Sequence, residues 1–230
     1  MPAVMAIPKT IRFVSFDVYG TLIDWETGAW EAFEKQATRD GISLKRDDVV
    51  ARFLQYQQEI KAGSYELYAE VLRRTALRIA KDLDWELEPS RSGFLPDSVA
   101  RWKPFKETNP ALTKLKKSFE VGLISNIDDK LLGLTRRHLP IDFDLVVTAQ
   151  QVRSYKPEPA HFTECARRVG GKRGWVHVAA SHYHDIAPCV KARVPVIWVN
   201  RNKETLDSSQ KKPTAEVPNL KEAAKLLGVS

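Results

Sequence analysis

Short, continuous hydrophobic runs alternate with segments of helical periodicity along most of this 230-residue chain. Runs that are rich in β-branched and aromatic residues, and that end at Gly, Pro or Asp, are typical of buried strands. They occupy residues 10–16, 120–125, 144–148, 175–180 and 195–200. Segments with helical spacing lie at residues 110–117, 128–138, 159–169, 185–192 and 219–227. Strand–helix alternation with strands apolar on both faces predicts an α/β fold, a Rossmann-like parallel sheet covered by helices.

Three further segments of helical periodicity lie between the first and second predicted strands. They cover residues 27–41, 47–63 and 64–83. Thr27 and Ser64 are candidate N-caps of the first and third segments. A group of helices placed directly after the first strand is typical of an inserted domain. We therefore predict a core domain of residues 1–24 and 100–230 with an α-helical cap of residues 25–99.

The composition is that of an ordinary globular protein, with 43% hydrophobic and 28% charged residues. It excludes collagen-like, disordered and disulfide-framework proteins, and Cys165 and Cys189 are expected to be free thiols. The longest apolar run, residues 194–199, is far shorter than the ~20 residues of a membrane span. The N-terminal stretch has no basic region and contains Pro8, so we expect no secretory signal and a cytoplasmic protein. Residues 201–218, rich in Lys, Ser, Asp and Pro, predict a surface loop.

The formal net charge of +7 is unevenly distributed along the chain. Residues 24–88 hold 14 acidic and 10 basic side chains, so the excess of positive charge lies in the remaining segments. One interpretation of this excess is a basic patch that binds nucleic acid, but the sequence has no zinc-finger spacing, RNP-like strand or polybasic tail. A solvated basic surface explains the excess more simply, and we predict no nucleic-acid partner. A locally positive cleft would also suit a small anionic substrate.

Polar residues follow the predicted strands where the apolar runs end. In a parallel sheet these ends share one edge, which is where ligands bind. Each residue alone is typical of a helix or turn cap, but together they predict an active site. The candidates are Asp17, Ser125, Asn126, Lys156, Ser181, His182 and Asp185.

Four motifs in this order resemble those of the haloacid dehalogenase superfamily. They are FDVYGTLID at 16–24, LISN at 123–126, YKPEP at 155–159 and AASHYHD at 179–185. The resemblance spans essentially the whole chain, and the position of the helical insertion is similar to that of a cap found in this superfamily. It implies a hydrolase with an aspartate nucleophile, while the reaction is a separate question.

Two positions resemble the 2-haloacid dehalogenase branch more than the phosphatases. Phosphatases of the superfamily have a second Asp two residues after the nucleophile, which protonates the leaving alkoxide, and this chain has Tyr19 there. A halide leaves without protonation, so a dehalogenase needs no such acid. Ser181 stands where magnesium-dependent members tend to have an Asp, which weakens an oxygen-ligand Mg²⁺ site. We therefore expect no metal or other cofactor, with Mg²⁺ required only if the chain is a phosphatase.

The resemblance implies roles for four residues of the core. Asp17 attacks the halogen-bearing carbon and forms an ester. Lys156 keeps Asp17 ionised and oriented. Asp185 orients Lys156 or activates the hydrolytic water. Thr21 or Lys156, with backbone N–H groups of the turn after Asp17, stabilises the oxyanion.

Substrate-binding roles are expected for Tyr19, for Ser125 and Asn126, and for two residues of the cap. Arg52 lies near the place of a cap Arg that binds the substrate carboxylate in the family, and Trp25 is expected to line an apolar pocket. The resemblance also implies a homodimer.

Two positions depart from the pattern of 2-haloacid dehalogenases. His182 replaces an Asn of the fourth motif, where an imidazole is able to position water or act as a base, although a structural role is also open. Phe162 replaces a Tyr six residues after Lys156. The alternatives to a dehalogenase are a phosphatase of the same superfamily and a non-catalytic protein that binds an acidic partner through its basic surface.

Overall fold

The computed structural model describes residues 5–229, so the first four residues of the N-terminal stretch considered for a secretory signal lie outside it. The described residues form two compact units. The first contains the chain up to Ile23, Pro104–Asn126 and the chain from Leu139 onward. The second contains Asp24–Lys103 and Ile127–His138. The helix that follows the second strand therefore groups with the helical insertion, whereas the sequence placed it in the core.

The first unit is built on a parallel sheet of six strands among the described residues, in the order β3-β2-β1-β4-β5-β6. The strands are β1 (Phe13–Phe16), β2 (Glu120–Ser125), β3 (Leu145–Thr148), β4 (Trp175–Ala179), β5 (Val196–Val199) and β6 (Ala215–Val217). The central strand β1 is buried along its whole length and pairs with both β2 and β4. The predicted α/β fold with a Rossmann-like parallel sheet is confirmed.

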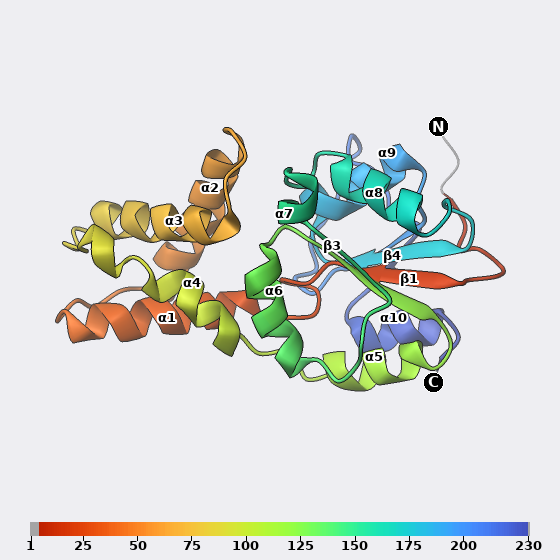
Figure 1. The fold of residues 1–230 in the computed structure, drawn as a ribbon, viewed down its shortest axis with the longest axis horizontal. Helices are drawn as coiled ribbons and strands as arrows, with labels where there is room; N and C mark the ends of the chain where they lie inside the picture. Colours follow the sequence, from red (N-terminus) through yellow and green to blue (C-terminus); the bar gives the residue numbers. More distant parts are fainter. Residues whose placement is uncertain (1–4, 230) are drawn as a thin grey trace. The chain divides into compact units, whose positions relative to one another are not determined.

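Helices cover both faces of this sheet (Figure 1). On one face lie α7 (Ala149–Val152), α8 (Ala160–Arg168) and α9 (Ala187–Ala192), and on the other α5 (Thr108–Lys116) and α10 (Leu220–Leu226). Cys165 of α8 and Cys189 of α9 are free thiols in the core between helices and sheet. Because both faces are covered, only the strand ends and the loops after them are open to a ligand.

Residues 201–218 were predicted to form a surface loop, but the end of this stretch, Ala215–Val217, is strand β6. Strand β6 adds to the sheet edge in parallel with β5, with Ile197 opposite Ala215 and Val199 opposite Val217. Thr214 also accepts a hydrogen bond from the N–H of Val196 through its hydroxyl. Only Val217 of the strand is buried, so this edge strand lacks the apolar run by which the other strands are recognised.

The second unit consists of helices. They are α1 (Trp25–Arg39), α2 (Arg46–Lys61), α3 (Tyr68–Asp82), α4 (Phe94–Ser98) and α6 (Asp129–Thr135), with 3₁₀ turns at Pro89–Arg91, Val99–Arg101 and Arg136–His138. The side chain of Asp24, not of Thr27, caps α1, because its carboxylate accepts from both the N–H and the hydroxyl of Thr27. Among the described residues no helix has the length and apolar character of a membrane span.

The third of these helices begins three residues later than the sequence predicts, at Tyr68 with Leu67 as its N-cap and not directly after Ser64. Asp128 provides the cap, since its two carboxylate oxygens accept from the N–H groups of Tyr68 and Ala69 at 2.7 Å each. The start of α3 is therefore fixed by a residue 60 positions away in the sequence.

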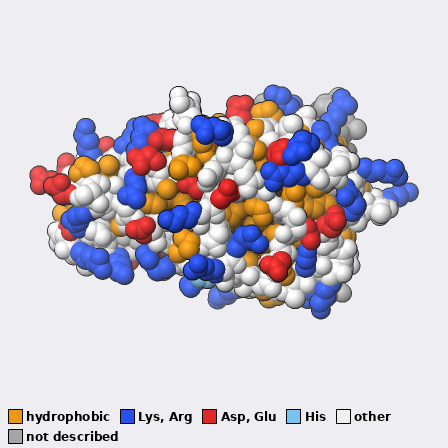
Figure 2. Space-filling model, viewed as in Figure 1, with side chains coloured by type: hydrophobic (Ala, Val, Ile, Leu, Met, Phe, Trp, Pro, Cys, Tyr) orange, Lys and Arg blue, Asp and Glu red, His pale blue; other side chains and the backbone are white. Residues whose placement is uncertain are grey.

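One face of the structure mixes acidic, basic and hydrophobic side chains (Figure 2). On the face drawn in Figure 2, Lys and Arg side chains are interspersed with Asp and Glu side chains and with hydrophobic groups.

Candidate active site

The end of strand β1 places Asp17 at the carboxyl edge of the sheet. Phe13–Phe16 are all buried, and the N–H of Asp17 donates to the carbonyl of Val178 in the neighbouring strand β4. The side chain of Asp17 is therefore fixed at the centre of the sheet edge, 6% exposed. A nearly buried carboxylate at this point needs compensating donors.

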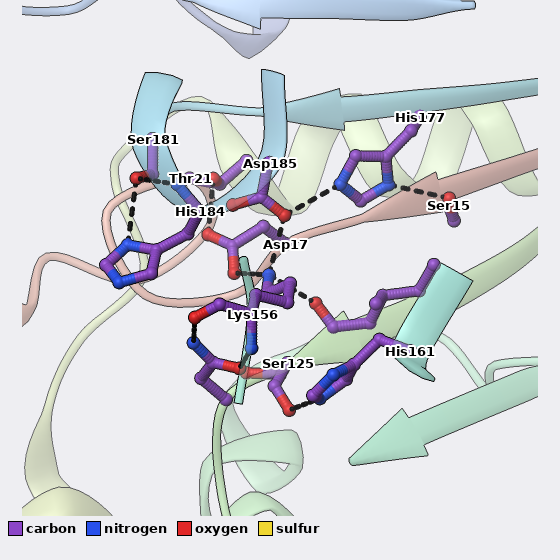
Figure 3. A network of polar contacts seen from close by, with 12 residues as sticks. Ser15, Asp17, Thr21, Ser125, Lys156, His161, His177, Ser181, His184 and Asp185 are labelled. Carbon is purple, nitrogen blue, oxygen red and sulfur yellow. Dashed lines mark hydrogen bonds and ion pairs between the residues drawn. The ribbon is translucent and has the colours of Figure 1, made fainter. Parts of the chain in front are cut away.

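Lys156, which follows α7, supplies the charge that balances Asp17. Its Nζ donates to Asp17 Oδ1 at 2.8 Å, to Asp185 Oδ1 at 2.6 Å and to the carbonyl oxygen of Ile124 at 3.0 Å. These three acceptors use all three ammonium protons. One buried ammonium thus bridges two buried carboxylates (Figure 3).

Asp185 comes from a π-helical turn, His182–Ile186, between β4 and α9. Its Oδ1 accepts from Lys156 Nζ and lies 3.0 Å from His177 Nε2. Its Oδ2 is also buried but has no hydrogen-bond partner among the described residues. One oxygen of this carboxylate therefore holds the site together, while the other is a spare acceptor.

Burial and charge shift the pKa values of these groups in different directions. Burial raises the pKa of Asp17, with Lys156 opposing this and the charge of Asp185 adding to it. Burial also disfavours ionised Asp185, but Lys156 and His177 outweigh it and bring that pKa down to about 2. For Lys156, burial lowers the pKa, yet the two carboxylates raise it above its usual value. The ammonium therefore stays charged.

Thr21 links the turn after Asp17 to the neighbouring loop. Its hydroxyl donates to Asp17 Oδ2 at 2.8 Å and accepts from the N–H of Ala180 at 2.9 Å. The backbone N–H groups of Gly20, Leu22 and Ile23 donate to carbonyls within the same turn. These three N–H groups, which were among the predicted oxyanion donors, are thus already used.

Arg201, a residue that the sequence did not single out, supports the same turn. It donates to the carbonyl oxygens of Gly20 and Thr21, at 3.2 and 2.8 Å, and pairs with Glu107 at 2.6 Å. Its guanidinium lies over the ring of Phe105, 3.7 Å from the ring centroid. A planar group with five donors is suited to holding several carbonyls in place.

Ser125 and Asn126, predicted to bind substrate, both lie beside Lys156. The amide of Asn126 accepts from the Lys156 N–H at 2.7 Å and donates to the Lys156 carbonyl at 3.0 Å, so it clamps the Lys156 backbone. The hydroxyl of Ser125 is buried, with no hydrogen-bond partner among the described residues. Of the two, Ser125 has the side chain that is free for a ligand.

His182 and Tyr19 belong to the same unit as Asp17. His182 Nε2 lies 2.8 Å from the Lys211 carbonyl, and its ring packs on the edge of Trp198. It therefore anchors the 201–214 segment. Tyr19 is partly exposed in the turn after Asp17, and its backbone forms a bridge with Ile23.

Arg52 and Trp25 belong to the helical unit. Arg52 forms ion pairs with Asp48 and Asp82, at 3.6 and 3.7 Å, and Trp25 stacks on Phe53 with the ring centroids 5.0 Å apart. Both side chains have partners within their own unit, and their predicted contact with a substrate stays a prediction.

Two buried histidines near the site also escaped the sequence analysis. His177 lies within β4 next to Asp185, and His161 lies on α8, with its Nε2 3.3 Å from the Ser125 carbonyl. Burial and the charge of Lys156 bring the pKa of His161 down to about 3, so this ring is neutral. His177 is a single His within an apolar run, and His161 is a single His on a predicted helix. Both patterns are typical of ordinary core positions, so the local sequence does not distinguish a site residue from a core residue here.

The arrangement suits a nucleophilic carboxylate better than a metal site. Both oxygens of Asp17 have donors, and the ammonium of Lys156 lies between Asp17 and Asp185, where its charge would repel a cation. The hydroxyl of Ser181 is turned to His184. No cluster of three metal-binding side chains was found among the described residues. The two carboxylates that face each other here, Asp17 and Asp185, are both bonded to Lys156, which disfavours Mg²⁺ between them.

Comparison with known proteins gives one family match. A family model for hydrolases, described as haloacid dehalogenase-like hydrolase, matches residues 11–180. This range contains the first three motifs and the beginning of the fourth.

Curated relatives and solved structures are similar over nearly the whole chain. The (S)-2-haloacid dehalogenase of Pseudomonas fluorescens is 25% identical over 234 residues, covering 95% of this chain and 97% of that protein. The glyceraldehyde 3-phosphate phosphatase of Methanothermobacter thermautotrophicus is 28% identical over 202 residues, covering 83% of this chain and 86% of that protein. One similar solved structure is the L-2-haloacid dehalogenase of Xanthobacter autotrophicus with chloropropionic acid covalently bound. It has a TM-score of 0.83 and 19% sequence identity, and the match covers 96% of this chain and 100% of that one. This last similarity shows the fold alone.

Proposed function

Because the chain belongs to the haloacid dehalogenase-like hydrolase family, as its four motifs predict, we propose that it displaces halide from small 2-haloacids through an ester on Asp17. The observation that carries this proposal is the buried carboxylate of Asp17, held by Lys156 Nζ on one oxygen and by the Thr21 hydroxyl on the other. A carboxylate with both oxygens fixed and an ammonium beside it is oriented for attack and kept ionised.

In the first half of the reaction a carboxylate oxygen of Asp17 attacks the halogen-bearing carbon. A carbon–oxygen bond forms, the carbon–halogen bond breaks, and the halide leaves with the electron pair. Attack from the side opposite the halogen inverts the carbon. No proton is needed by the leaving group, which agrees with Tyr19 at the position of the phosphatase acid.

In the second half water hydrolyses the ester. The water oxygen bonds to Cγ of Asp17, and one water proton goes to Asp185 Oδ2. The Asp17 oxygen that did not attack the substrate becomes the oxyanion, and its own donor, Thr21 or Lys156, stabilises it. The bond between Cγ and the substrate oxygen then breaks, and the alkoxide takes up the proton from Asp185. Asp17 loses the remaining proton to solvent, so haloacid and water give hydroxy acid, halide and a proton.

The remaining assignments belong to the same proposal. Ser125 binds the substrate carboxylate or the halide through its unpartnered hydroxyl. Tyr19 is assigned to substrate binding as well. Asn126 acts by holding the backbone of Lys156. His182 acts by holding the segment of residues 201–214. Arg52 and Trp25 stay candidates for substrate binding. The enzyme is taken to be a cytoplasmic homodimer that needs no metal and binds neither nucleic acid nor membrane. Light scattering tests the dimer.

Halide release in the presence of a chelator tests the activity. We expect the wild-type protein to release halide from 2-chloropropionate, and Asp17→Asn to lose at least about 1,000-fold of this activity because its amide is a poor nucleophile. Turnover in ¹⁸O-labelled water is expected to place the label in the peptide that contains Asp17, because water attacks that carboxyl carbon. Substantial halide release by purified Asp17→Asn, or label in the product alone, would contradict the mechanism.

A phosphatase is the second candidate, favoured by the 28% identity to the glyceraldehyde 3-phosphate phosphatase. It is tested by phosphate release from a generic phosphomonoester with Mg²⁺. Activity in this assay alone would reverse the proposal. Inactivity in both assays over a broad panel would favour a non-catalytic protein that binds an acidic partner.

A further inference from the structure

A buried chain of hydrogen bonds leads from the interior of the sheet to Asp185. Trp175 Nε1 donates to the Ser15 hydroxyl at 2.7 Å, Ser15 Oγ lies 2.8 Å from His177 Nδ1, and His177 Nε2 lies 3.0 Å from Asp185 Oδ1. Ser15 comes from β1, and Trp175 and His177 come from β4. Ser15, His177 and Asp185 are drawn in Figure 3. All four side chains are fully buried.

The donor inventory of these groups sets the direction of the hydrogen bond to Asp185. The indole N–H of Trp175 only donates, so the Ser15 oxygen is its acceptor. The ionised Asp185 only accepts, so His177 Nε2 must carry a proton. With a proton on Nε2 alone, Nδ1 accepts from the Ser15 hydroxyl, and with a second proton Nδ1 donates to the Ser15 oxygen. In both cases His177 donates to Asp185 through Nε2.

We propose that His177 is a positioning residue for ester hydrolysis, acting through Asp185. His177 and Lys156 together take Asp185 Oδ1, which orients the carboxylate and leaves Oδ2 as the acceptor for the proton of the hydrolytic water. Asp17 has no contact with His177 in this network, so the first half of the reaction does not depend on the ring. This inference rests on the proposed function and adds to it the residue that controls its second step.

Loss of the ring is expected to slow only the second step. In His177→Leu, the carboxylate of Asp185 loses one of the two donors on Oδ1, and we expect kcat to fall about 10- to 100-fold, as is typical when an orienting partner is removed. Because formation of the ester is unaffected, KM falls with kcat and kcat/KM is unchanged. Halide then appears as a burst of about one equivalent per site, and intact-mass spectrometry detects the ester.

Three further variants separate positioning from structure. His177→Gln puts an amide N–H near the place of Nε2 and is expected to restore most of kcat and remove the burst. Ser15→Ala removes the hydrogen-bond partner of Nδ1 and is expected to give an intermediate burst. Val176→Ala, the adjacent buried residue of β4, loses core volume without touching Asp185, and we expect no burst. If His177→Leu does not fold, the Gln and Ser15 variants still decide the question.

An NMR measurement tests the hydrogen-bond chain without any turnover. Long-range ¹⁵N–¹H spectra of histidine-labelled protein are expected to show His177 with a proton on Nε2. An Nε2 without a proton, or a burst-free His177→Leu with wild-type kcat, would overturn the inference. If the wild-type protein releases no halide at all, the proposed function fails, whereas the NMR result still decides the state of His177.

Discussion

The ammonium of Lys156 is the only partner that Asp17 and Asp185 share within the described network, so its removal leaves two buried negative charges facing each other. We expect Lys156→Met to lower the free energy of unfolding by about 3–5 kcal/mol, the range for breaking a buried ion pair, and to abolish halide release. Urea unfolding followed by circular dichroism measures the first effect. Lys191→Met, an exposed change on α9, serves as the control. A Lys156→Met protein as stable as wild type would contradict a charged triad.

The raised pKa of Asp17 makes a prediction for the pH dependence of catalysis. Burial and the charge of Asp185 raise this pKa, and only the ionised carboxylate attacks carbon. The rate of halide release is therefore expected to fall, as the pH is lowered, at a pH above the ordinary Asp value of about 3.9. The pH profile of kcat/KM measures this, because it reports the free enzyme. An acid limb below the ordinary value would show that Lys156 outweighs burial.

At the scale of single residues, the sequence predicts the candidate catalytic groups better than the residues that support them. Asp17, Lys156 and Asp185 end apolar runs or follow them, and the topology of a parallel sheet brings such positions together. His177 and Arg201 carry no comparable signal. Their partners are distant in the sequence, and each is an ordinary residue until the sheet places it beside its partner.

At the scale of elements, the cap of α3 depends on a residue far away in the chain. Both carboxylate oxygens of Asp128 accept N–H groups of the first turn, from Tyr68 and Ala69. We expect Asp128→Ala to lower the free energy of unfolding by about 0.5–2 kcal/mol, the range for a lost N-cap. Thermal or urea unfolding measures the loss, with the exposed loop change Asp142→Ala as a control. Equal stability of the two variants would show that the first turn of α3 needs no cap.

The predicted helices and strands agree with the structure where local periodicity or an apolar run determines them. The apolar run at residues 120–125 matches β2, and helical spacing at residues 47–63 matches α2 to within two residues at either end. Strand β6 and the start of α3 were missed because pairing with β5 and the carboxylate of Asp128 determine them. Neither partner is visible in a local sequence window.

At the scale of the whole molecule, the order of strands and helices along the chain predicts the fold. Buried parallel strands joined by helices form a covered sheet, and β1 takes its centre with β2 and β4 on either side. The sequence did not predict that residues 127–138 group with the helical insertion, because periodicity shows that a helix forms but not where it packs. The roles of the two units as catalytic core and cap stay a prediction.

The net charge of +7 belongs to the whole molecule as well, and it makes the last prediction. The excess of basic residues lies outside residues 24–88, in the segments that also supply Asp17, Lys156 and Asp185. A positive field of this kind attracts a small carboxylate at low salt, and added ions screen it over a Debye length of ~10 Å at 0.1 M.

We therefore expect kcat/KM for 2-chloropropionate to fall several-fold when the ionic strength is raised from about 0.02 M to about 0.5 M. The uncharged 2-chloropropionamide is the matched control, because its carbon–halogen bond is similar but it has no charge to be attracted. The value of kcat for the acid is expected to change little, since the bound complex is no longer steered. A fall of equal size for acid and amide would instead show an effect of salt on the enzyme itself, and the excess charge would then be plain surface.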